Sequence, residues 1–269
     1  MGDEPQPRAR HKISVILRIF IAFCIIAPGS VVYVGICILL LPSRALRIRT
    51  GNLYGKIMGQ VVFRLAGIKP VIKNRERMHA GPAIFVCNHT STVDMWVSMW
   101  LCPIGGCGVA KKEIARLPFF GQAYLLSGHL LIDRGDRQKA VASMAAAREV
   151  VRKNKLSLWM WPEGTRSRDG RLQPLKKGFV HLAIAMGLPI VPLVFHDADL
   201  RWRGASFHVV PGELQIEVLE PLDTSSWKAE TAAEHARELW LRFHRTLSER
   251  QRGEDPEDSS AGAGPDEKP

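Results

Sequence analysis

Two residues that could move a proton follow one apolar run of this sequence. His89 and Asp94 lie five positions apart, directly after the apolar residues 83–87. In a straight helix, residues five apart point about 140° away from each other, so this pair can meet only across a turn. There the carboxylate can accept from one ring nitrogen and leave the other as a base. The pattern predicts a catalytic dyad without its own nucleophile; a capped helix start, with Thr90 or Ser91 as N-cap, is the alternative.

A second polar segment, Glu-Gly-Thr-Arg at 163–166, comes shortly after the apolar residues 156–160. Because the ligand site of an open α/β sheet lies beyond the carboxyl ends of its strands, this segment and His89 are expected to share one crevice. A guanidinium holds a phosphate through paired hydrogen bonds, and Gly164 lets the backbone approach closely. The segment therefore predicts a phosphate site at Arg166; a polar turn with a surface Arg–Glu pair is the alternative.

The residues around these segments alternate between strand and helix patterns. Short apolar runs predict strands, and longer stretches with apolar residues at helical spacing predict helices. Beyond the two runs above, strands are expected at 107–110, 130–133, 190–195 and 214–219, and helices from near residue 92, within 112–126, and at 137–153, 176–186 and 230–250. This alternation predicts an α/β fold, an αβα layered domain around a largely parallel or mixed sheet. The order of the strands does not follow from the pattern.

Four separated motifs resemble the glycerolipid acyltransferase family, which includes the 1-acylglycerol-3-phosphate acyltransferases. They are the His-x-x-x-x-Asp box at 89–94, the run 128–134, the Glu-Gly-Thr-Arg box at 163–166, and the strand 188–194, which is entered through a proline. The segments 110–113 and 117–121 also resemble the family, and order and spacing agree over roughly residues 80 to 195. Trp161 stands where the family more often has Phe.

The resemblance implies direct acyl transfer, without an acyl-enzyme. His89 would remove the proton from an acceptor hydroxyl, while Asp94 holds the ring tautomer and stabilises the imidazolium. The alkoxide would then attack a thioester carbonyl, whose developing negative charge needs donors. Backbone N–H groups of the helix after His89, or Lys111, are the candidates for that task. Arg134 and Arg166 would hold the acceptor's phosphate.

The family's chemistry implies lysophosphatidic acid as the acceptor and phosphatidic acid as the product, with Glu163, Gly164 and Thr165 shaping the phosphate pocket. Glycerol 3-phosphate and other lysolipids are the alternative acceptors. The donor is expected to be the thioester of coenzyme A or of acyl carrier protein, because a basic surface suits either anionic partner. No further cofactor and no metal are expected.

Two other function classes use part of these features. A thioester or lysolipid hydrolase would direct the same dyad at water, but has less need of two phosphate-holding arginines. A catalytically silent membrane adaptor has no reason to keep His89, Asp94, Glu163 and Arg166 together. Ser91 is a rival nucleophile, but it lacks a Gly-x-Ser-x-Gly elbow and is better placed to cap a helix.

The N-terminal part predicts membrane association. Residues 19–41 carry no charge and are long enough to cross a bilayer. A break is expected at 27–30, where proline and glycine interrupt the run. Because basic residues flank both sides, a re-entrant or interfacial hairpin with both ends on the cytoplasmic face is favoured over a single span. It also resembles the membrane-dipping helical pair of the family.

Composition sets the remaining expectations. The 269 residues, 46% of them hydrophobic, can bury one substantial core. Residues 251–269 hold six acidic and two basic side chains, a net charge of −4, so the rest of the chain carries +15 of the total of +11. That basic body suits lipid surfaces and phosphates, and no nucleic-acid module is present to favour nucleic acid. The five cysteines are expected to be reduced core residues, as in cytosolic proteins. Three units are therefore predicted: a membrane-associated segment at 1–50, an acyltransferase domain at 51–250 and a disordered acidic tail at 251–269.

Overall fold

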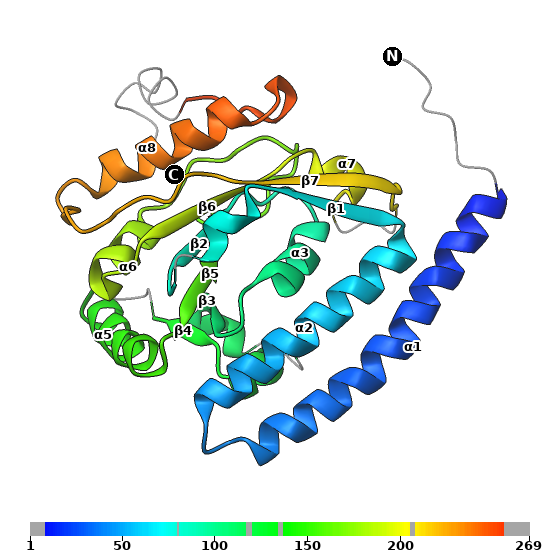
Figure 1. Ribbon diagram of the computed structural model, residues 1–269, viewed down its shortest axis with the longest axis horizontal. Helices are drawn as coiled ribbons and strands as arrows, with labels where there is room; N and C mark the ends of the chain where they lie inside the picture. The colour runs from blue at the N-terminus through cyan, green and yellow to red at the C-terminus, as the bar shows by residue number, and fades with distance from the viewer. Residues whose placement is uncertain (1–8, 80, 117–119, 134–136, 205–207, 256–269) are drawn as a thin grey trace.

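Figure 1 shows the computed structural model of the chain, which describes residues 9–79, 81–116, 120–133, 137–204 and 208–255. In these ranges, helices cover both faces of a seven-stranded sheet. The strands are β1 Ile68–Lys73, β2 Ile84–Cys87, β3 Gly106–Lys111, β4 Leu130–Ile132, β5 Ser157–Met160, β6 Ile190–Phe195 and β7 Gly212–Val218. The helices are α1 Ala9–Leu39, α2 Arg44–Ala66, α3 Val93–Leu101, α4 Phe120–Leu126, α5 Arg137–Asn154, α6 Gly178–Met186, α7 Ala198–Arg201 and α8 Ala232–Thr246, with 3-10 turns η1 Arg75–His79, η2 Lys112–Arg116 and η3 Glu249–Gln251. The predicted α/β class and layered architecture are confirmed.

The strand order β1-β7-β6-β2-β5-β3-β4 places β2 near the middle of the sheet. All neighbouring pairs are parallel except β6 with β7. Val86 pairs with Met160 of β5, and Cys87 pairs with Leu193 of β6. The carboxyl ends of β5, β2 and β6 therefore lie side by side at one edge, which is where a parallel sheet places its ligand site.

Strand β2 is buried on both faces. Ile84 and Val86 belong to a core that includes residues of α5, α6 and α8, whereas Phe85 and Cys87 belong to a second core beneath α3. A strand covered on both sides reads as a continuous apolar run rather than as an alternating one. Burial of apolar surface stabilises the fold by about 25 cal/mol per Å². This burial holds in place the strand that leads into His89.

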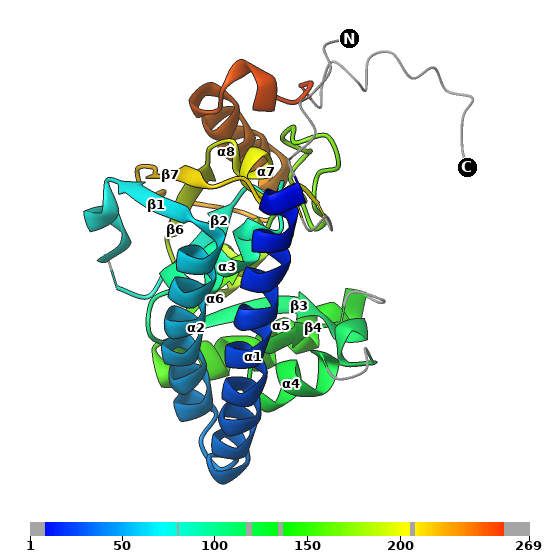
Figure 2. The same ribbon diagram turned by 90° about the vertical axis from the view of Figure 1, so that its right-hand side faces the viewer.

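Helix α1 runs unbroken through Pro28, so the expected break there is wrong. The packing of α2 along α1 (Figure 2) favours the continuous helix, and Tyr54 of α2 adds a polar contact near the proline. The hydroxyls of Ser30 and Tyr54 both bond the carbonyl of Ile26, at 2.8 and 3.1 Å. Gly29 leaves room for this contact, since a Cβ there would lie 3.3 Å from the Tyr54 ring. The chain turns only at residues 40–43, and α2 crosses the position between the first two predicted units, residue 50.

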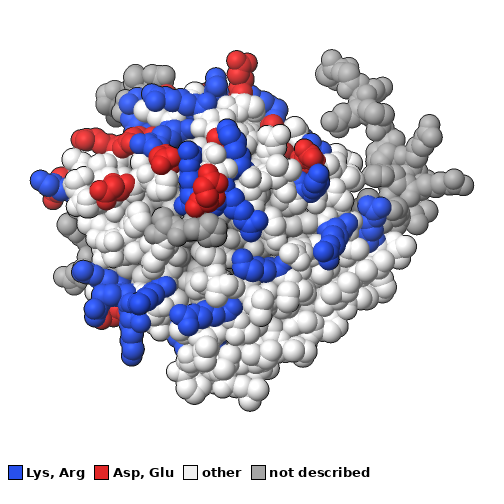
Figure 3. Space-filling model, viewed as in Figure 1, with Lys and Arg blue, Asp and Glu red and all other residues white. Residues whose placement is uncertain are grey.

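The α1–α2 pair presents an apolar surface. Residues Phe20–Leu39 form a stretch long and apolar enough to cross a membrane, and little of it is buried. Figure 3 shows few charged side chains over α1, whereas basic and acidic residues gather over the part of the molecule that contains α8 and the adjoining sheet. Large exposed apolar side chains on the pair include Phe20, Ile25, Val31, Val32, Ile38, Leu39, Leu53 and Ile57.

Two arginines of α2 tie the turned end of the pair to the body of the protein. Arg44 donates to the carbonyls of Gly128 and His129, at 2.7 and 2.9 Å. Arg47 donates to the carbonyl of Leu126. Charge-assisted hydrogen bonds of this kind are stronger than neutral ones, so the apolar pair is fixed to the α4–β4 connection.

At the other end of the chain, the residues after α8 pack on the domain. Residues 251–255 are described, and Gln251 is completely buried. The rest of the predicted acidic tail, 256–269, lies outside the described residues. All five cysteines are free thiols, and four of them are buried.

His129 joins β3 to the α4–β4 connection. Its Nδ1 accepts a hydrogen bond of 3.1 Å from the backbone N–H of Gly108, and its ring packs against Tyr124. A nitrogen that accepts this bond carries no proton. Desolvation, together with the charge of Arg44, lowers the pKa of His129 to about 4.

The lowered pKa of His129 predicts a loss of stability in acid. Between pH 6.5 and about 4, the unfolded state binds a proton at this histidine and the folded state does not, so stability falls as the pH falls through this window. Thermal unfolding measured at pH 7 and at pH 4.5 gives the stability lost between the two. This loss should be smaller in His129→Gln than in the unsubstituted protein, by about 1–3 kcal/mol. The control His235→Gln, at a ring stacked on Trp227, should keep the full loss. An equal loss of stability in the unsubstituted protein and in both variants would contradict the lowered pKa of His129.

Candidate active site

The backbone of His89 is held on both sides by the loop that follows β5. Its N–H donates to Oε1 of Glu163 at 2.6 Å, and its carbonyl accepts from the N–H of Ser167 at 2.8 Å. The polar segments after β2 and β5 therefore lie together, as their places after neighbouring parallel strands predict.

The side chain of His89 pairs with Asp94 at the start of α3. Nδ1 lies 3.0 Å from Asp94 Oδ2. An ionised carboxylate only accepts, so Nδ1 carries the hydrogen and Nε2 is left as an acceptor. The same Oδ2 accepts from the backbone N–H groups of Thr90 and Ser91, each at 2.7 Å. Asp94 thus shapes the turn and orients the ring at once; the N-cap of α3 is Thr92, without a side-chain capping bond, so the expected cap at Thr90 or Ser91 is wrong.

Asp94 is fully buried, and burial raises the pKa of its carboxyl group. The hydrogen bonds from His89, Ser91 and Thr90 oppose that rise because they stabilise the charged form. Its second oxygen, Oδ1, is buried without a hydrogen-bond donor among the described residues. All three donors therefore act on a single carboxylate oxygen, which is the one that faces the imidazole.

Trp161 lies against the His89 ring, with centroids 4.5 Å apart and planes 16° from parallel. The imidazole keeps 18% of its surface exposed, so the stack covers one face and leaves an edge open. This contact of Trp161 with His89 was not predicted from the sequence. The available signal was the spacing of Trp159 and Trp161, because residues two apart along a strand point to the same side; Trp159 stacks on Phe85 in the core on that side.

Glu163 is a buried link between loops. Both carboxylate oxygens accept backbone hydrogen bonds, Oε1 from His89 and Oε2 from Gln173 at 3.0 Å. Burial raises the pKa of Glu163 to about 8, against the lowering effect of these two bonds, and the nearby Asp94 adds to the rise. Its oxygens face the backbone, so the geometry favours positioning of His89 over direct contact with substrate.

The other residues of the Glu-Gly-Thr-Arg box are exposed. Arg166 donates from Nη1 to the hydroxyl of Thr92 at 3.1 Å, which holds its guanidinium over the start of α3. Gly164 has φ +75°, and a Cβ there would lie 2.9 Å from Lys176 Nζ. This turn therefore requires glycine, and it allows the ammonium group to lie above the backbone. Thr165 lies at the surface of the same turn.

A pocket of about 300 Å³ opens beside this loop. Its lining includes Thr90, which comes one residue after His89. It also includes three guanidinium side chains, those of Arg166, Arg168 and Arg203. The hydroxyl oxygen of Thr90 is buried and bonds no described residue. A concave site lined by three guanidinium groups is suited to an anion with several oxygens. Only Arg166 of these arginines was a predicted site residue.

The side chains of two predicted site residues are not described by the structure. Lys111 ends β3, and its side chain is not described; Arg134 lies outside the described residues. The backbone N–H groups of residues 90–93 all bond other atoms of the protein, whereas the predicted oxyanion donors are N–H groups of the helix after His89, which is α3. Among the described residues, no group of three His, Cys, Asp or Glu side chains could hold a metal ion.

The chain is similar to known proteins in sequence and in fold. Residues 69–196 match the acyltransferase family. The 1-acyl-sn-glycerol-3-phosphate acyltransferase of Limnanthes douglasii is 43% identical over 86% of this chain and 82% of its own length. The protein of that name from Escherichia coli is 34% identical over 69% of this chain and 74% of its own length. The crystal structure of the 1-acyl-sn-glycerophosphate (LPA) acyltransferase PlsC from Thermotoga maritima has the same fold, with a TM-score of 0.67, 22% identity, and coverage of 87% of this chain and 95% of that one.

The chain therefore belongs to the acyltransferase family. The resemblance inferred from the four motifs is confirmed, and within the family the similar curated proteins carry the name 1-acyl-sn-glycerol-3-phosphate acyltransferase.

The two backbone hydrogen bonds that Glu163 accepts predict the effect of replacing its carboxylate with an amide. Glu163→Gln keeps one acceptor oxygen and turns an NH₂ group toward a backbone N–H, so one buried donor loses its partner at a cost of about 1–3 kcal/mol. We expect the unfolding temperature to fall by roughly 2–4 °C for each kcal/mol, and turnover to fall further as His89 shifts. The control Glu213→Gln, at an exposed pair with Lys69, should change neither quantity. Unchanged turnover in Glu163→Gln would remove the positioning role.

Proposed function

We propose that this chain transfers a fatty acyl group from an acyl thioester to the free hydroxyl of lysophosphatidic acid, and so forms phosphatidic acid. The observation that carries the proposal is the 3.0 Å hydrogen bond between His89 Nδ1 and Asp94 Oδ2, one residue away from a pocket lined by arginines. The names of the plant and bacterial relatives support this acceptor.

In the proposed reaction, Nε2 of His89 takes the proton of the acceptor hydroxyl as its oxygen attacks the thioester carbonyl. Asp94 keeps the ring in the required tautomer and stabilises the imidazolium that forms. The new C–O ester bond forms, the C–S bond breaks, and the proton passes from His89 to the departing thiolate. Backbone N–H groups in the first turn of α3 beyond Val93, or Lys111, would stabilise the oxyanion.

The acceptor's phosphate is assigned to the arginine pocket. Arg166 binds it, and Arg134 assists from the run after β4. Gly164 and Thr165 shape the turn that carries Arg166, and Glu163 holds this turn against His89. Guanidinium groups bind phosphate oxygens in pairs, so the pocket would select acceptors that carry a phosphate monoester.

The α1–α2 pair is proposed to rest in the membrane, with the catalytic body on the cytoplasmic face. Its exposed apolar side chains favour a lipid environment over water. The net positive charge of the body would draw it toward anionic lipid and toward an anionic donor, either acyl-CoA or acyl carrier protein. Substrate and enzyme would then meet at the interface, where lysolipids reside.

A product assay tests the reaction. We expect the detergent-purified protein, offered an acyl thioester, to form phosphatidic acid from lysophosphatidic acid, as measured by mass spectrometry. His89→Ala should lower turnover at least about 10³-fold while the unfolding temperature stays within a few degrees. His181→Ala, a substitution on α6 away from the dyad, should retain turnover.

Other products would change the assignment in defined ways. Full activity in His89→Ala would exclude the dyad. Product formed only from a zwitterionic or uncharged lysolipid would keep the chemistry and exclude the phosphate pocket. Free fatty acid formed at the same rate with and without acceptor would point to a hydrolase.

Loss of the phosphate contact should affect binding more than chemistry. Arg166→Ala is expected to raise the KM for lysophosphatidic acid about tenfold or more, which corresponds to about 1.4 kcal/mol, with a smaller change in kcat. Arg171→Ala, an exposed arginine five residues further along the same loop, is the matched control and should leave KM within about twofold. Equal KM values for the two variants would exclude Arg166 from the acceptor site. Initial rates over a range of lysophosphatidic acid concentrations provide the measurement.

A further inference from the structure

An acidic residue lies in the wall of the arginine pocket. Asp199 of α7 lines the pocket together with Arg166, Arg168 and Arg203, and only 8% of its surface is exposed. A carboxylate at this place would repel the phosphate that the arginines attract, and the repulsion is stronger where water is excluded. The pocket therefore needs a device that removes the effect of this charge.

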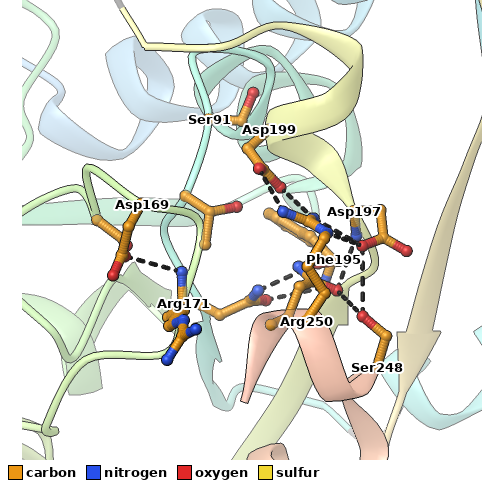
Figure 4. A network of polar contacts seen from close by, with 12 residues as sticks. Ser91, Asp169, Arg171, Phe195, Asp197, Asp199, Ser248 and Arg250 are labelled. Carbon is orange, nitrogen blue, oxygen red and sulfur yellow. Dashed lines mark hydrogen bonds and ion pairs between the residues drawn. The ribbon is translucent and has the colours of Figure 1, made fainter. Parts of the chain in front are cut away.

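Arg250, from the turn η3 near the end of the described chain, supplies that device (Figure 4). Its Nη1 donates to Asp199 Oδ2 at 2.8 Å, and its Nη2 donates to Asp199 Oδ1 at 2.7 Å. Both oxygens of the carboxylate are thus taken by one guanidinium in a two-pronged contact. The same Nη2 reaches Asp197 Oδ1 at 2.7 Å, so Arg250 bridges two carboxylates. These contacts raise the pKa of Arg250, which keeps it charged at every relevant pH.

The turn that carries Arg250 is fixed to the active-site edge of the sheet. Gln251 accepts from the N–H of Asp197 at 2.9 Å and donates to the carbonyl of Phe195, where β6 ends. Its own carbonyl accepts from Leu172 at 2.8 Å, in the loop after β5. These bonds therefore hold the backbone that carries Arg250 beside Asp199.

The ion pair also packs directly under the pocket. Gly170, which lines the pocket, has φ +83°, and a Cβ on it would lie 2.5 Å from Asp199 Oδ2 and 3.1 Å from Arg250 Nη1. The backbone of the arginine-bearing loop thus rests on the Asp199–Arg250 pair. Arg250 itself is absent from the pocket lining, so it acts on the pocket through Asp199.

We propose that Arg250 is a positioning residue that cancels the charge of Asp199, so that the pocket of Arg166, Arg168 and Arg203 keeps its affinity for the phosphate of the acceptor. This inference rests on the proposed function for the identity of the acceptor. It assigns to a residue 84 positions after Arg166, outside the matched region 69–196, a share in acceptor specificity.

A charge-cancelling role and a merely structural role for Arg250 differ in the effect of a second substitution. In Arg250→Gln, Asp199 stays charged and unpaired, so the KM for lysophosphatidic acid should rise about tenfold, with kcat changed less than threefold. In Asp199→Asn the charge is absent, and KM should stay within about twofold. In the double variant both charges are gone, so KM should return to within about threefold of the unsubstituted protein.

The result that would overturn the proposal is a double variant as impaired as Arg250→Gln, or Arg250→Gln with an unchanged KM. Arg250→Lys covers the case in which Arg250→Gln fails to fold, because an ammonium group restores the charge without the two-pronged geometry. Its KM should stay within about threefold, and a tenfold rise would overturn the proposal. Arg242→Gln, at an exposed pair with Glu238 on α8, is the control and should change nothing.

A second readout separates this inference from the proposed function. Glycerol 3-phosphate should raise the unfolding temperature of the unsubstituted full chain and of the double variant, and raise it less in Arg250→Gln. This pattern without formation of phosphatidic acid would reject the proposed function and keep the inference. Phosphatidic acid formation without recovery in the double variant would reject the inference alone. No protection of any variant and no phosphatidic acid would reject both.

Discussion

The position of the His89 backbone is the constraint on which the site depends. Its N–H and its carbonyl are both bonded to the loop after β5, through Glu163 and Ser167. One position earlier, the side chain of Asn88 donates to and accepts from the backbone of Phe195, where β6 ends, at 3.1 and 2.8 Å. Three parallel strands that end level with one another are thus joined across their exits. Rigid strands, rather than free loops, set the geometry of the dyad.

Local pattern predicted the parts of the fold whose burial is simple. β2 is covered on both faces and β6 is fully buried, so each reads as an apolar run in sequence. The strand β1 was not predicted, because it is half exposed and contains Pro70 and two lysines. Helix α2 was missed as well, and its glycines explain why. A Cβ on Gly55 would lie 2.9 Å from a carbonyl of α3, and one on Gly59 would lie 2.6 Å from Trp100. Here close helix packing overrides low helix propensity.

The residues and contacts of the candidate site were likewise predictable only in part. His89, Asp94 and the 163–166 box were predictable because each follows a strand and each residue type has a chemical use. Their mutual contacts followed from the parallel sheet alone. The stack of Trp161 on His89 and the pair of Asp199 with Arg250 were not predictable as contacts, since they join residues 72 and 51 positions apart. The unbroken course of α1 through Pro28 was not predictable either, because the helix packs along another helix, α2.

The buried Gln251 has a consequence for where this domain can be divided. The region that matches the family model ends at residue 196, yet the side chain of Gln251 bonds the carbonyl of Phe195 inside that region, and its backbone carbonyl bonds Leu172. A fragment cut at that limit would keep the dyad and the arginine-bearing loop, but it would lack β7, expose the antiparallel edge of β6 and leave the N–H of Leu172 without the carbonyl of Gln251. The smallest unit able to fold and work independently therefore extends through η3. In evolutionary terms, the recognisable module and the cooperative folding unit of this protein differ in length.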